Sequence, residues 1–217
     1  MVLELALSVD GASRRIDGHV LLSDASVSVA AGTIVGVLGP NGAGKTSLMR
    51  AIAGRLRLDS GRVLIDGGLS PADARRQARL GVVPQEIALF NDLTVRENLS
   101  VLGRLAGVPS RQIADRVDEG LRWAGLEDRA DAIVTTLSGG MRRRANLVAS
   151  TLHRPRLLLL DEPSVGVDAD ARPRLHALLR ALRAQGGGLL MATHDVEEAS
   201  DLCDEVVVMA AGRIVAQ

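Results

Sequence analysis

The chain has 217 residues, of which 47% are apolar, and its 26 basic residues balance its 26 acidic residues. This composition excludes a disordered chain and a generally basic surface for nucleic acid, while the length suits a single domain over 1–217. The apolar runs, such as 157–160, are far shorter than the ~20 residues of a membrane helix, and the N-terminus lacks a signal-peptide pattern. Cys203 is the single cysteine, so no internal disulfide can form, which fits a reducing cytoplasm.

The first third of the chain alternates short apolar runs with turns. Gly, Pro and Asp residues bound these runs, which is typical of strands, and a helical pattern follows one Gly-rich turn. We predict, in chain order, strands over 2–9, 20–29 and 33–38, a helix over 45–53, and strands over 62–66 and 80–83.

The pattern changes to helical spacing in the middle of the chain. One predicted helical face carries Val95, Leu99, Leu102 and Leu105, and a second carries Ile113, Val117 and Leu121. This spacing predicts a helical subdomain at about 88–154. Beyond it we expect strands over 156–160, 189–193, 205–209 and 211–215, and helices over 170–184 and 196–202. Strands that alternate with helices favour an α/β fold with a largely parallel sheet covered on both faces.

A phosphate-binding loop follows the strand at 33–38. Its sequence, GPNGAGKT, matches G-x-x-x-x-G-K-[ST], and it contains Lys45, the only lysine of the chain. Glycines let backbone N–H groups converge on phosphate oxygens, the helix that follows presents its positive end, and lysine adds a point charge. The alternative is a Gly-rich turn with an incidental lysine, which its place between a strand and a helix disfavours. The predicted phosphate-binding residues are Gly39, Pro40, Asn41, Gly42, Ala43, Gly44, Lys45, Thr46 and Ser47.

Two acidic residues end the most apolar predicted strand. Asp161 and Glu162 follow the run 157–160, and ligands gather at the carboxyl ends of such buried parallel strands. Asp161 and the Thr46 hydroxyl are therefore predicted to hold Mg²⁺, and Glu162 is predicted to polarise the attacking water. The alternative is a strand that simply runs into a solvated acidic turn.

A second anion-binding helix start is predicted at residues 137–141, LSGGM. Ser138, Gly139 and Gly140 open a helix, about ninety positions after the phosphate loop. The order of the phosphate loop, Gln85, LSGG, the apolar strand with its Asp-Glu end, and His194 resembles the ABC ATPase family over essentially the whole chain. The resemblance implies a P-loop NTPase core with a largely parallel sheet, an antiparallel β subdomain at the N-terminus, and a helical subdomain that carries the LSGG signature.

The resemblance also implies roles for individual residues. Two subunits would sandwich two MgATP molecules, with Ser138, Gly139 and Gly140 contacting the γ-phosphate of ATP held by the other subunit. Gln85 would approach the metal and the water, and His194 would contact the γ-phosphate and orient Glu162. The implied catalytic residues are Glu162, His194, Gln85 and Lys45, and the implied metal ligands are Thr46, Gln85 and Asp161.

Three features of the sequence depart from the pattern of the family. The family usually stacks adenine on an aromatic residue near position 16, where this chain has Ile16, so ATP and GTP should be poorly discriminated. Met141 replaces the usual glutamine of the signature, and valines flank Gly166 in the segment that crosses the dimer interface. The stretch LSGGMRRR resembles the branch of the family that serves exporting permeases.

The expected partners are a second copy or a homologous ATPase subunit, and a transmembrane permease that holds the chain at the cytoplasmic face of the membrane. Phe90, just after Gln85, is a candidate for contact with the permease, or else it packs within the helical subdomain. Three other functions remain open: an importer ATPase, a non-hydrolysing nucleotide switch, and a chromosome or translation ATPase. The last of these usually carries coiled coils or two cassettes, which do not fit this spacing.

Overall fold

The structure is a computed structural model that describes residues 4–217, and of residues 74 and 77 the backbone only. Its smaller sheet is antiparallel, in the order β2 (His19–Ala30), β1 (Leu5–Ile16) and β4 (Ser60–Ile65). Its larger sheet has the order β5 (Leu80–Val83), β6 (Leu157–Asp161), β7 (Gly188–Thr193), β3 (Ile34–Leu38), β8 (Glu205–Ala210) and β9 (Arg213–Ala216). All neighbours in this sheet are parallel except β8 and β9, which confirms the prediction of a largely parallel sheet.

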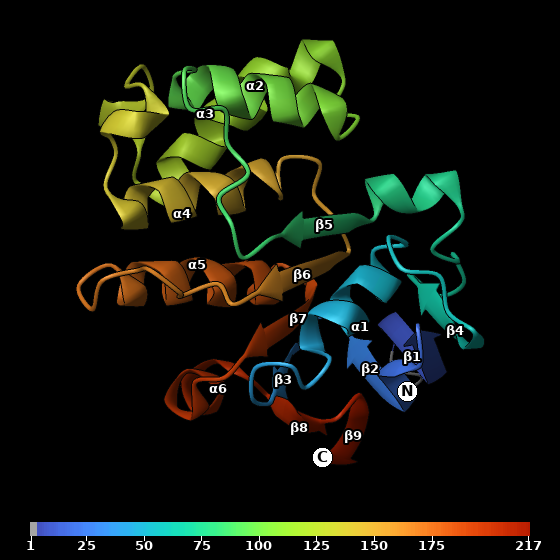
Figure 1. The fold of residues 1–217 in the computed structure, drawn as a ribbon. Coiled ribbons are helices and arrows are strands. Elements are labelled where there is room, and N and C mark those ends of the chain that lie inside the picture. The colour runs from blue at the N-terminus through green and yellow to red at the C-terminus, as the bar shows by residue number, and fades with distance from the viewer. Residues whose placement is uncertain (1–3) are drawn as a thin grey trace.

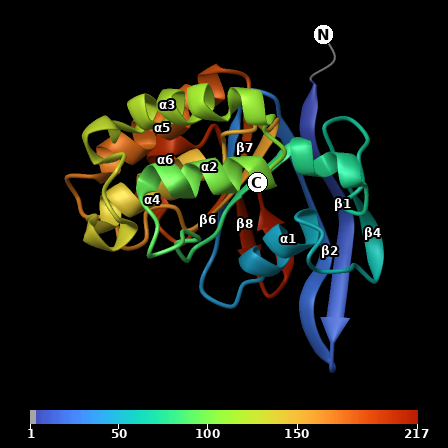
Figure 2. The same ribbon diagram turned by 90° about the horizontal axis from the view of Figure 1, so that it is seen from above.

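The alternating side chains of β6 explain how the larger sheet is covered. Leu157 and Leu159 face one way and join the core around α1 (Lys45–Ile52), which lies between the two sheets (Figure 2). Leu158 and Leu160 face the other way and join the core around α5 (Arg172–Ala184), with α6 (Val196–Leu202) beside it. Both faces of β6 are therefore buried, as its continuous apolar sequence predicts.

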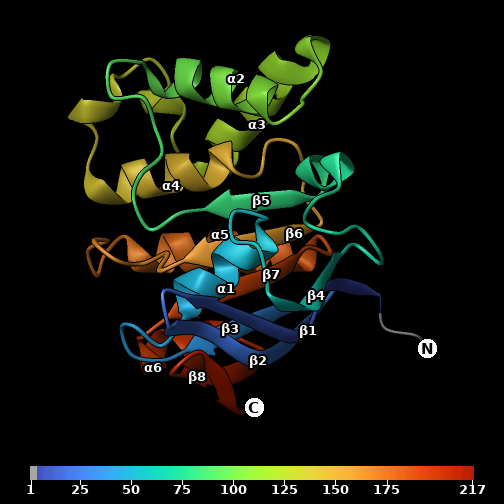
Figure 3. The ribbon, with the colours of Figure 1, turned by 45° about the vertical axis from the view of Figure 1, so that its right-hand side comes forward.

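The helices α2 (Val95–Leu105), α3 (Ile113–Ala124) and α4 (Gly139–Ala149) form a separate layer beyond β5 (Figure 1, Figure 3). They share their own apolar cluster. Helix α2 starts at a capping box in which Thr94 and Glu97 bond each other's backbone N–H groups. Short 3₁₀ turns lie at η1 (Ala74–Ala78), η2 (Ser110–Gln112), η3 (Glu127–Arg129) and η4 (Val134–Thr136).

Two predictions differ from the structure. The first strand runs to Ile16 instead of ending at Val9; residues 2 and 3 of the predicted strand lie outside the described residues. Asp17 and Gly18, both at positive φ, make a tight hairpin that lets β1 continue through polar residues beside β2. Leu105, predicted on the buried face of its helix, is 65% exposed because it is the last residue of α2.

Among residues 4–217, no helix combines the length and apolar character needed to cross a membrane.

Candidate functional site

A cavity of about 370 Å³ lies beside the phosphate loop, at the carboxyl ends of the parallel strands. It brings together most of the residues predicted from the sequence. The predicted residues that line it are Pro40, Asn41, Gly42, Ala43, Gly44, Lys45, Thr46, Ser47, Gln85, Asp161, Glu162 and His194. Gly39 contributes its carbonyl oxygen, which accepts a hydrogen bond from Lys45.

The phosphate loop folds tightly because of its glycines. Gly44 has φ +107 at the start of α1, and a Cβ there would lie 2.8 Å from the carbonyl oxygen of Leu21. A side chain would therefore open the loop. Lys45 is 6% exposed, and its Nζ donates to the carbonyl oxygens of Gly39 at 2.6 Å and Pro40 at 3.4 Å. The ammonium group is thus held over the loop by backbone oxygens.

Glu162 lies between two basic side chains. Its Oε1 is 3.4 Å from Lys45 Nζ, and its Oε2 is 2.9 Å from His194 Nδ1. Strand pairing explains the second contact: β6 and β7 are parallel neighbours, so the residues that follow them come together, and Glu162 N–H donates to Ala192. Glu162 is only 7% exposed, with φ +50, an uncommon conformation for a residue with a side chain. Such strain often accompanies a functional site.

The residues predicted to hold Mg²⁺ fit that ion. Burial raises the pKa of Asp161 most strongly, and the Glu162 carboxylate adds to this, while a hydrogen bond from Thr46 opposes them. Asp161 Oδ1 is buried and has no hydrogen-bond partner among the described residues, so one oxygen is available to a ligand. Gln85 reaches the same cavity because it follows β5, the parallel neighbour of β6. Hydroxyl, carboxylate and amide oxygens are ligands that Mg²⁺ prefers, together with nucleotide phosphates and water.

The signature segment lies apart from this cavity. Ser138 caps α4 by accepting from the Met141 N–H at 3.2 Å, as predicted for a helix start. Ser138 and Gly139 are exposed, and neither lines the cavity of the phosphate loop. Gly140 is buried, and a Cβ there would lie 2.7 Å from the Cβ of Ala171. In a single chain, this second anion-receptive helix start therefore faces outward.

Ile16 does not line the cavity. It ends β1 at the hairpin, opposite His19, and is 37% exposed. Val20 and Leu21, from the start of β2, line the cavity instead. A role for Ile16 in holding the base stays a prediction, and the structure adds Val20, which is 43% exposed, as an apolar residue that lines the cavity of the phosphate loop.

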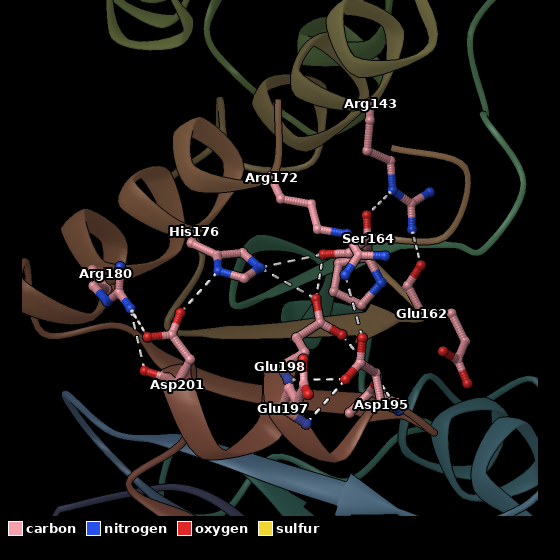
Figure 4. A network of polar contacts seen from close by, with 12 residues as sticks. Arg143, Glu162, Ser164, Arg172, His176, Arg180, Asp195, Glu197, Glu198 and Asp201 are labelled. Atoms are coloured by element: carbon pink, nitrogen blue, oxygen red, sulfur yellow. Dashed lines mark hydrogen bonds and ion pairs between the residues drawn. The ribbon is translucent and has the colours of Figure 1, made fainter. Parts of the chain in front are cut away.

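A polar network between α5 and α6 adjoins the segment that follows Glu162 (Figure 4). Glu198, on α6, accepts hydrogen bonds from Ser164 and from Thr193, the latter at 2.8 Å. His176 Nδ1 is 3.1 Å from Asp201, and its Nε2 is 3.5 Å from both Ser164 and Glu198. The hydrogen bond with Glu198 is the main reason that the pKa of His176 is raised.

This network joins the segment after Glu162 to the strand before His194. Burial alone would raise the pKa of Glu198, but hydrogen bonds from His176, Ser164 and Thr193 bring it below its usual value. Sequence analysis missed these residues because a His on one helix and a Glu on another carry no shared motif. Only the packing of α5 against α6 brings them together.

Known proteins match this chain over most of its length. Residues 22–165 match the ABC transporter family. The chain is 43% identical over 212 residues to a Nod factor export ATP-binding protein I of Ralstonia nicotianae, covering 97% of this chain and 66% of that protein. It is 40% identical over 214 residues to the protein of that name from Rhizobium leguminosarum bv. viciae. This match covers 98% of this chain and 69% of that protein. The chain thus spans about two thirds of the length of these relatives.

Solved structures resemble the whole chain. An ATP-binding subunit of an ABC transporter superposes with a TM-score of 0.87 at 28% identity, covering 99% of this chain and 89% of that one. CbiO1 from Clostridium perfringens, part of the ABC transporter complex cbiONQ, superposes with a TM-score of 0.89 at 28% identity. The match covers 99% of this chain and 88% of that one.

Proposed function

Because the chain belongs to the ABC transporter family as an ATP-binding subunit, we propose that it hydrolyses MgATP between two subunits to drive a separate membrane permease. The observation that carries this proposal is the placement of Glu162 beside His194 and Lys45 in the cavity of the phosphate loop. A carboxylate at this place can take a proton from a water that attacks the γ-phosphate, while Lys45 and the loop N–H groups neutralise the phosphates. Mg²⁺, held by Thr46, Asp161 and Gln85, would stabilise the charge that develops on the phosphoryl oxygens.

The dimer is proposed because one chain contributes the phosphate loop to one nucleotide site and the signature helix to another. The helix start at Ser138 can receive a phosphate, but it lies outside the cavity of its own chain. A second copy, or a homologous subunit, placed head to tail would bring its Ser138 segment over this cavity. Each nucleotide would then bind the phosphate loop of one subunit and the signature helix of the other.

The permease is proposed to dock on the groove between the helical layer and the larger sheet. This groove has a volume of about 520 Å³ and is lined in part by Arg55, Arg76, Ala88 and Leu105. Phe90, two residues beyond Ala88, is 50% exposed, so it is available to a partner. An amphipathic helix from a permease would bury Phe90 and Ala88 with its apolar face, and its polar face would meet the arginines of the groove, at the cytoplasmic side of the membrane.

The direction of transport is proposed to be export. The relatives from Ralstonia nicotianae and Rhizobium leguminosarum bv. viciae are named as export ATP-binding proteins, and the LSGGMRRR stretch resembles the exporter branch. The test is phosphate release by the purified protein, with Mg²⁺ and with EDTA, alone and in vesicles that contain the membrane protein that co-purifies with it. We expect release that needs Mg²⁺ and that rises with the permease. Tight ATP binding without phosphate release would instead favour a nucleotide switch. Uptake of the transported substrate into right-side-out vesicles would favour import.

A further inference from the structure

Arg143, in the second turn of α4, makes an unusual set of hydrogen bonds. All five N–H donors of its guanidinium find backbone carbonyl oxygens. Nε donates to Pro163 at 2.6 Å, Nη1 to Pro84 at 2.8 Å and Gln85 at 2.9 Å, and Nη2 to Asp161 at 3.2 Å and Glu162 at 2.7 Å. The side chain is 2% exposed, so water contributes little to its solvation.

These five carbonyl groups belong to two segments of the proposed catalytic site. Pro84 and Gln85 follow β5, and residues 161–163 end β6 and continue beyond it. Figure 4 shows the Arg143 side chain reaching from its helix to the backbone beside Glu162. A single guanidinium therefore ties the signature helix to the glutamine segment and to the segment that carries the general base.

The same face of α4 makes further hydrogen bonds to β5 and to the segment after it, which contains Gln85. Asn146 Oδ1 accepts from the Ala88 N–H at 3.1 Å, and Ser150 Oγ donates to Val82 at 2.8 Å. Positions 143, 146 and 150 are three and four residues apart, so they share one helix face. The helix is thus attached along β5 and the residues after it, and Arg143 extends this attachment to Glu162.

The charge of Arg143 is not used in an ion pair within the described part of the chain. Burial lowers the pKa of its guanidinium, and the nearby carboxylates of Asp161 and Glu198 oppose that effect. Carbonyl dipoles solvate the cation in place of a carboxylate. One of them belongs to Glu162, whose φ of +50 is strained for a residue with a side chain, so the bond helps to hold that conformation.

We propose that Arg143 is a positioning residue that couples the signature helix and the Gln85 segment to the place of the Glu162 carboxylate. This inference rests on the proposed function, in which Glu162 acts on the attacking water. A shift of α4 or of the glutamine segment moves the carbonyl groups that share the guanidinium, and the backbone of Glu162 moves with them. A lysine cannot replace this contact, because its ammonium has three donors and lacks the planar fork.

The test compares Arg143→Lys with Arg144→Lys. Arg144 is the matched control: it is also buried on α4, at 6% exposure, but its guanidinium donates to Ala124 and Gly125 at the end of α3. Misplacement of a reacting group by about 1 Å can lower a rate about 100-fold. We expect Arg143→Lys to lower kcat by about tenfold or more, with KM for ATP within about twofold. Arg144→Lys should keep kcat within about twofold, although both variants should melt at similarly lowered temperatures.

Hydrogen exchange provides a readout that does not depend on catalysis. In the nucleotide-free protein, Arg143→Lys should speed the exchange of the Ala88 and Glu162 amides, and Arg144→Lys should leave both unchanged. Wild-type kcat and unchanged exchange in Arg143→Lys would overturn the positioning role. If the wild-type protein releases no phosphate, the proposed function fails by itself, and the exchange rates still decide whether Arg143 holds the two segments.

Discussion

Replacing Glu162 with glutamine should change turnover, nucleotide affinity and stability in three different ways. The carboxylate has two neighbours in the nucleotide-free protein: Lys45 Nζ at 3.4 Å and His194 Nδ1 at 2.9 Å. Glutamine keeps the shape of the side chain but cannot take a proton from water. It also removes the negative charge that Lys45 pairs with before a nucleotide arrives.

The geometry sets the expected magnitudes. At 3.4 Å and an effective dielectric constant of about 20, the attraction between Lys45 and Glu162 is about 5 kcal/mol before desolvation is subtracted. Desolvation cancels much of this, and removal of one partner leaves a buried charge unpaired. We expect Glu162→Gln to lose roughly 2 kcal/mol of unfolding free energy without nucleotide, a drop in Tm of roughly 5 °C.

Nucleotide binding should change in the opposite direction. Because Lys45 no longer has to leave a carboxylate partner, the phosphates meet an ammonium group that only backbone oxygens hold. A gain of about 1.4 kcal/mol corresponds to about tenfold tighter binding. Loss of a general base should lower phosphate release by roughly 10²- to 10⁴-fold.

Three measurements check this prediction. Calorimetric titration with ADP gives the affinity without closure of a dimer, a melting curve gives the stability, and phosphate release gives the rate. The control is the same substitution in a Lys45→Met background, where Glu162→Gln should no longer change the affinity for ADP. Near-normal phosphate release from Glu162→Gln, or weaker ADP binding than in the wild type, would refute the assignment of this carboxylate.

Four further substitutions test other parts of the molecule. Ser138→Arg should abolish phosphate release but keep ADP affinity within about twofold, because Ser138 lies outside the cavity; a fully active monomer would contradict the dimer. Phe90→Ala should lower transport more than basal hydrolysis; equal losses of both with a lower Tm would favour a packing role. Ile16→Tyr should tighten ATP binding by up to about tenfold without changing kcat, as judged by ATP and GTP titrations. The hydrogen bond with Glu198 raises the pKa of His176 above 6.5 in the folded protein. Protonated His176 therefore contributes fully to the free energy of unfolding below pH 6.5, and this contribution is lost as the pH rises through the folded-state pKa. The excess unfolding free energy of wild type over His176→Gln, measured in urea, should therefore shrink between pH 6 and 8, and a pH-independent difference would contradict the assignment.

The sequence predicted those parts of the fold whose pattern is local. Strand β5 and helix α6 have the bounds predicted for them, because Pro84 ends one and Asp195 caps the other. The phosphate loop and the Asp161–Glu162 pair could be predicted because each carries its chemistry on consecutive residues. Strand pairing then accounts for the meeting of Glu162 with His194.

Features that depend on packing could not be predicted in this way. Arg143 looked like one of three consecutive arginines, and only the register of α4 shows which of them faces the catalytic segments. The length of β1 depends on its pairing with β2 and β4, which lets polar residues remain in a strand. The position of Ile16 at the hairpin, outside the cavity, follows from the same pairing.

The single lysine of these 217 residues has a practical consequence. Reagents that acylate amines find one lysine side chain in this sequence, and it is 6% exposed in the cavity of the phosphate loop. Labelling of Lys45, followed by mass spectrometry of its peptide, therefore measures occupancy of the cavity without a background from surface lysines. A bound nucleotide should protect the amine, so the extent of labelling against nucleotide concentration gives a binding curve from the unmodified protein.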